Sequence, residues 1–67
     1  MKLRAVFAQN LKNARERLAV SQEELAHRAG IDRTYVSALE RCKYSATLDV
    51  VERLAASLNV PADELLR

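Results

Sequence analysis

The chain has 67 residues and a net charge of +2. A chain of this length forms one small domain with a thin core, which excludes a deep catalytic cleft. Glycine, proline and cysteine occur once each, which excludes loop-rich hairpin folds and secreted domains held by disulfides. Alanine, leucine, arginine and glutamate are abundant, and all of them favour helix. The sequence therefore predicts an all-α fold, with a single domain over residues 1–67.

Apolar residues recur three or four positions apart along the first stretch of the chain. This spacing predicts a helix over residues 2–18 with one buried face. The residues on that face are Leu3, Phe7, Leu11, Ala14 and Leu18. The same stretch lacks the continuous apolar core of a signal peptide, and no run approaches membrane-spanning length. We therefore expect a cytoplasmic protein without membrane contact.

A second helix is predicted over residues 21–28. Ser21 and Glu24 have the spacing of a capping box, in which each side chain accepts a hydrogen bond from the backbone N–H of the other residue. Gly30 follows at the place where a helix commonly ends in a left-handed residue. The residues expected to face inward are Leu25, Ala26 and Ala29.

A third helix is predicted over residues 32–41, because Asp32 is a good N-cap. At 100° per residue, Tyr35, Val36 and Leu39 fall on the inward side. The opposite side is polar and basic, with small residues among the charges. It consists of Arg33, Thr34, Ser37, Ala38 and Arg41.

Two further helices are predicted in the last third of the chain. Either Thr47 or Asp49 caps the fourth, which ends near Asn59. Its expected inward residues are Leu48, Val51, Leu54, Ala55 and Leu58. Pro61 suits the first turn of a short fifth helix that runs through residue 66.

The short connection at residues 29–32 predicts a steep crossing of the second and third helices. Such a crossing leaves the outer side of the third helix exposed. Arginine can bond guanine through two N–H groups, and methyl groups can contact the thymine methyl in the major groove. Positive charge gathers in residues 1–20 and 33–44, whereas residues 45–67 are net acidic. The pattern predicts a surface that binds double-stranded DNA.

These motifs resemble the Cro and lambda-repressor type of helix-turn-helix regulator, the XRE family. The resemblance runs through residues 21–26, 29–41, 47–48 and 58–66. It implies a five-helix lambda-repressor-like fold with the helix-turn-helix at the second and third helices. Cys42 stands where the family usually has glycine, so we expect either backbone strain or a longer third helix there. Ser45 and Ala46 replace a common Asn-Pro pair.

The resemblance also assigns roles to individual residues. The residues that would face base edges are Arg33, Thr34, Ser37 and Ala38. Those that would hold DNA phosphates are Gln22, Tyr35, Arg41, Lys43 and Tyr44. Arg15 and Glu40 are expected to form a shielded ion pair. The Asp-Arg-Thr-Tyr run at residues 32–35 also resembles the small controller proteins of restriction–modification systems.

One recognition helix reads too few base pairs to select an operator, and helix-turn-helix proteins solve this by two-fold pairing. The acidic C-terminal third is not expected to contact DNA, so it is available for pairing with a second copy. We expect a homodimer on a palindromic operator, with apolar contacts from Val50, Val60 and Leu66.

A transcription regulator, either a repressor or an activator, has two alternatives among function classes. An antitoxin that also controls its own operon would bind DNA in the same way, with a toxin protein as a second partner. An enzyme is not expected, because no nucleophile–base pair, metal cluster or phosphate loop is present. His27 and Cys42 are too few ligands for a metal site, and no cofactor is expected.

Overall fold

The structure, a computed structural model, describes residues 2–67, which form four α-helices and a short 3-10 helix. The elements in chain order are α1 (Leu3–Arg17), α2 (Gln22–Ala29), α3 (Arg33–Glu40), α4 (Leu48–Ser57) and η1 (Ala62–Leu66). The all-helical prediction is confirmed, and each α-helix lies within about two residues of its predicted bounds. The prediction of a fifth α-helix is wrong. The last element is a 3-10 helix of 5 residues, a length at which the tighter helix is common.

Side chains cap three of the four α-helices at their N-termini. The Ser21 hydroxyl accepts the Glu24 N–H, the Asp32 carboxylate accepts the Thr34 N–H, and the Thr47 hydroxyl accepts the Val50 N–H. Thr47, not Asp49, is therefore the cap of α4. Only one of the two hydrogen bonds of the expected capping box forms. The Glu24 carboxylate accepts a bond from Arg28 Nε one turn later, at 2.9 Å, instead of one from the Ser21 N–H.

All four α-helices end in the same way, with one residue in the left-handed conformation. These residues are Ala19, Gly30, Cys42 and Asn59, with φ between 57° and 70°. The next residue then donates its N–H back across the last turn, in bonds from Val20 to Arg15, Ile31 to Ala26, Lys43 to Ala38 and Val60 to Ala55. This is the Schellman arrangement. Of the two outcomes expected at Cys42, backbone strain is the one observed.

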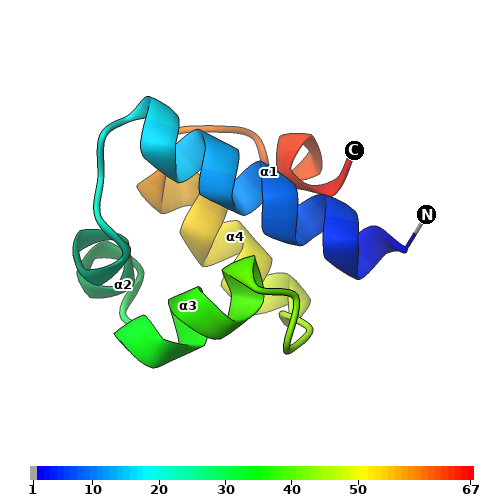
Figure 1. Cartoon of the computed structure of the whole chain (residues 1–67). Coiled ribbons are helices and arrows are strands. Elements are labelled where there is room, and N and C mark those ends of the chain that lie inside the picture. Colours follow the sequence, from blue (N-terminus) through cyan, green and yellow to red (C-terminus); the bar gives the residue numbers. More distant parts are fainter. Residues whose placement is uncertain (1) are drawn as a thin grey trace.

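The core is apolar and lies where the helices converge (Figure 1). Packing is closest between α1 and η1, α2 and α3, α2 and α4, α1 and α3, and α4 and η1. The largest fully buried side chains are Leu11, Leu25, Val36, Leu39, Leu54, Leu58 and Leu65. The Asn10 side chain holds η1 against α1 by donating to the carbonyl groups of Leu65 and Arg67.

Three leucines that were expected to face inward are instead exposed. Leu3, Leu18 and Leu48 are 59%, 47% and 77% exposed. Each stands at a helix end, where the periodic stripe continues but no neighbouring helix covers it. Helical spacing identifies the face of a residue and not the length over which that face is covered.

Candidate nucleic-acid interface

The connection between α2 and α3 is closed by backbone hydrogen bonds. Gly30 has a φ of 70°, and the Ile31 N–H donates to the Ala26 carbonyl at 3.0 Å. A side chain rarely adopts this backbone conformation, so glycine removes a steric cost here. Asp32 then starts α3 at once through its bond to the Thr34 N–H, at 3.0 Å. This bond lowers the pKa of the Asp32 carboxyl below its usual value.

The outer side of α3 carries three of the four residues expected to read bases. Arg33 and Thr34 are exposed, and Ser37 is half-buried. Buried Val36 and Leu39 on the opposite side fix the helix against the core. A rigid helix with an exposed arginine and two hydroxyls on one face has donors and acceptors that suit base edges in a major groove.

Ala38 does not belong to this exposed set, and its expected role is corrected here. The residue is 6% exposed. The chain that follows α3 folds back onto this position, because the Lys43 N–H donates to the Ala38 carbonyl at 2.9 Å. A side chain this buried has almost no surface to offer a base.

The residues expected to hold phosphates cluster at the end of α3, apart from Gln22. Arg41, Lys43 and Tyr44 are exposed. Cys42 turns the chain with a φ of 61°, and the Lys43 N–H donates back to the Ala38 carbonyl of α3. The Tyr35 hydroxyl donates to the Ser45 carbonyl over a long distance of 3.5 Å. Tyr35 thus contacts the loop after α3 while remaining half-buried.

The expected ion pair between Arg15 and Glu40 is present. Arg15 Nε lies 2.6 Å from Glu40 Oε2, and Arg15 Nη2 lies 3.0 Å from Glu40 Oε1. The hydrogen bond to this carboxylate raises the pKa of Arg15. Arg15 also donates to the Val20 carbonyl, and Gln22 donates to Glu40. The bond from Gln22 was not expected, since nothing in the spacing of two residues on different helices indicates it.

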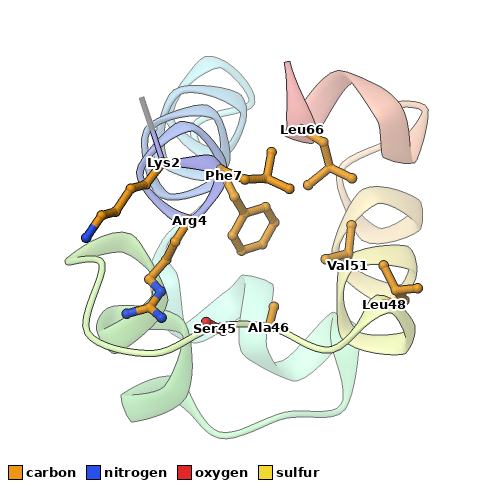
Figure 2. A pocket seen from close by; sticks show the side chains of 9 residues that line it. Lys2, Arg4, Phe7, Ser45, Ala46, Leu48, Val51 and Leu66 are labelled. Atoms are coloured by element: carbon orange, nitrogen blue, oxygen red, sulfur yellow. The ribbon is translucent and has the colours of Figure 1, made fainter.

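A groove of about 400 Å³ opens between the start of α1, the loop before α4, and η1 (Figure 2). Its apolar lining includes Leu3, Phe7, Leu48 and Leu66, while Lys2 and Arg4 lie at its edge. This groove was not predicted from the sequence. Its one indication in the sequence is a leucine such as Leu48, which stands at a helix end and continues an apolar stripe.

The three residues expected at a dimer interface are half-buried. Val50, Val60 and Leu66 pack against the edge of the core and keep part of their surface exposed. Within residues 2–67, no set of three side chains is arranged to hold a metal ion. Over the same residues, no helix has both the length and the apolar character needed to cross a bilayer.

The chain matches a family model and is similar to several known proteins. A model of the helix-turn-helix family HTH_3 matches residues 11–65. A hypothetical transcription factor from Neisseria meningitidis serogroup B is 50% identical over 96% of this chain, which spans 60% of that relative's length. Control protein C.SmaI from Serratia marcescens is 35% identical over 98% of this chain and 79% of its own length.

The solved structures agree with the sequence comparisons. The restriction-modification controller protein C.AhdI from Aeromonas hydrophila superposes with a TM-score of 0.90 at 35% identity. The superposition covers 92% of this chain and 94% of that protein. The likeness therefore extends over the connection between α2 and α3 as well as the surrounding helices.

Proposed function

This chain belongs to the helix-turn-helix family HTH_3 of DNA-binding transcription regulators, and we propose that it binds a specific palindromic operator as a homodimer. In this proposal α3 enters the major groove of each half-site. The observation that carries it is the exposed face of α3, where Arg33 and Thr34 project from a helix that the core holds in place.

Eight residues then have a defined part in binding. Arg33, Thr34 and Ser37 contact base edges. Gln22, Tyr35, Arg41, Lys43 and Tyr44 contact the phosphates on either side of the groove. Phosphate contacts supply affinity and fix the register, whereas base contacts supply specificity. The N-terminus of α2, which the uncharged Ser21 caps, adds backbone N–H groups that favour a nearby anion.

The dimer interface in this proposal lies on α4 and η1. Val50, Val60 and Leu66 supply part of the apolar contact, and Leu48 extends it because it is the most exposed large apolar side chain of the described residues. Leu48 and Leu66 both line the groove, which gives the partner's apolar side chains a place to pack. A small interface of this kind predicts a weak dimer that DNA stabilises.

We further propose that residues 1–67 act as one domain in the cytoplasm, where an operator is accessible. The identity to control protein C.SmaI and the fold of the restriction-modification controller protein C.AhdI support a controller-type regulator. Neither an enzymatic activity nor a toxin partner is part of this proposal.

Selection of bound sites from random duplex DNA tests the proposed function. The expected result is one inverted repeat whose half-sites are separated by about one helical turn, roughly 34 Å. Selection of a single half-site or of a direct repeat would contradict the dimer. Enrichment of no sequence at all would contradict sequence-specific binding.

A further inference from the structure

Hydrogen bonds join three polar side chains from three different helices. They are Arg15 of α1, Gln22 of α2 and Glu40 of α3. Arg15 bonds both carboxylate oxygens of Glu40, at 2.6 and 3.0 Å. Gln22 Nε2 donates to Glu40 Oε1 at 3.1 Å. Glu40 therefore accepts hydrogen bonds from the first helix and from the second at the same time.

The burial of this cluster sets it apart from the other ion pairs of residues 2–67. The side chains of Arg15 and Glu40 are 12% and 4% exposed, whereas the Glu24–Arg28 and Asp63–Arg67 pairs lie at the surface. A buried ion pair is rarely more stabilising than apolar residues of similar volume, because both charges lose their hydration. Stability alone is therefore a weak reason for placing these charges here.

Gln22 is the uncharged member of the cluster. It is the first residue of α2 and is half-buried. Its amide nitrogen carries two hydrogens, and Glu40 accepts one of them. A carboxylate accepts hydrogen bonds only, so the nitrogen of the amide must be the atom turned toward Glu40. The second N–H on the same nitrogen then points in a fixed direction away from that bond.

This orientation matters for an anion. A DNA phosphate also accepts hydrogen bonds only, so a glutamine can bind it through N–H but not through its oxygen. A freely rotating amide would present either atom and would lose side-chain entropy on binding. We propose that Glu40, held by Arg15, is a positioning residue that orients the Gln22 amide so that its second N–H donates to a DNA phosphate. The proposal rests on the proposed DNA-binding function.

Affinity for a random-sequence DNA duplex tests this, because a phosphate contact does not depend on base sequence. Gln22→Ala is measured in the native background and in an Arg15→Met/Glu40→Leu background, where the ion pair is replaced by apolar side chains. We expect Gln22→Ala to weaken binding about tenfold in the native background. In the apolar background the loss should fall below about threefold, because the amide is no longer oriented.

An equal loss in both backgrounds would overturn the positioning role, and so would the absence of a loss in the native background. If the native protein does not bind duplex DNA at all, the proposed function fails instead. Thermal unfolding of each variant separates these outcomes from a loss of folded protein.

NMR of the Gln22 side-chain amide gives a second readout that needs no variant of the ion pair. On titration with the same duplex, the amide proton that does not face Glu40 should shift more than its partner. Equal shifts of both protons, or no shift of either, would overturn the proposal even if the apolar background failed to fold.

Discussion

The left-handed residues at the ends of the helices provide a direct test of the backbone energetics. Cys42 has a φ of 61° and Ala19 a φ of 57°. For a residue with a Cβ this conformation costs roughly 1–2 kcal/mol. Glycine removes that cost but raises the entropy of the unfolded chain by roughly 0.4–1 kcal/mol. Cys42→Gly and Ala19→Gly should therefore each stabilise the protein by about 0.5–1 kcal/mol.

Gly30 ends α2 in the same left-handed conformation, so the opposite substitution can be tested there. No atom lies within 4 Å of the position that a Cβ would take at Gly30, so a clash cannot explain any loss. Gly30→Ala should destabilise the protein by about 0.5–1 kcal/mol, the reverse of the change at Ala19.

Urea and thermal unfolding followed by circular dichroism measure all three variants. For a chain of this size, 1 kcal/mol corresponds to about 4–8 °C in Tm. Ala56→Gly is the matched control for Ala19→Gly, because Ala56 is exposed inside α4 and glycine there should destabilise by about 1 kcal/mol. Cys42→Ser keeps the backbone cost and should give no gain. If Ala19→Gly destabilised the protein as much as Ala56→Gly, the reasoning from φ would be refuted.

Three further predictions concern the ion pair, the cap of α3 and the proposed dimer. Arg15→Met should lower the free energy of unfolding by about 3–5 kcal/mol because Glu40 is left buried and unpaired, and urea titration should show that adding Glu40→Leu recovers most of the loss. The pKa of Asp32 is lower in the folded protein than in the unfolded chain. Its cap therefore contributes its full stabilisation above the unfolded-state pKa of about 3.9, and this stabilisation is lost as the pH falls through the lower folded-state pKa. The stability advantage over Asp32→Asn should therefore shrink below about pH 4 in unfolding curves, and an advantage independent of pH would contradict the cap. Leu48→Glu should shift sedimentation profiles toward the monomer while leaving the circular dichroism spectrum unchanged; an unchanged profile would remove Leu48 from the interface.

Local chemistry explains the parts of the fold that the sequence predicted well. Ser21, Asp32 and Thr47 cap their helices through side-chain bonds to residues two or three positions away. Gly30 marks a left-handed helix end by its identity alone. Such features depend on neighbouring residues only, so a sequence pattern is enough to find them.

The errors arose where helical spacing alone does not decide which residues are covered or how a helix ends. Helical spacing placed Ala38 on the exposed outer side of α3, but the residue is buried. The same spacing placed Leu48 in the core, although no neighbouring element covers the start of α4. Ala19 has a left-handed conformation that its residue type disfavours.

The candidate site also has a part that the sequence predicts and a part that it does not. Exposure of Arg33, Thr34, Arg41 and Lys43 follows from their positions on or directly after α3. The bond between Gln22 and Glu40 joins residues on different helices, and only the packing of α2 against α3 brings them together.

The most direct test of the central claim compares Arg33→Ala with Lys43→Ala on a selected operator and on a random-sequence duplex. Arg33 is proposed to read a base, so its loss should weaken operator binding by about 1–3 kcal/mol and leave random duplex binding nearly unchanged. Lys43 is proposed to hold a phosphate, so its loss should weaken binding to both duplexes alike and reduce the salt dependence. If Arg33→Ala weakened both duplexes equally, α3 would not be reading sequence and the account would be contradicted.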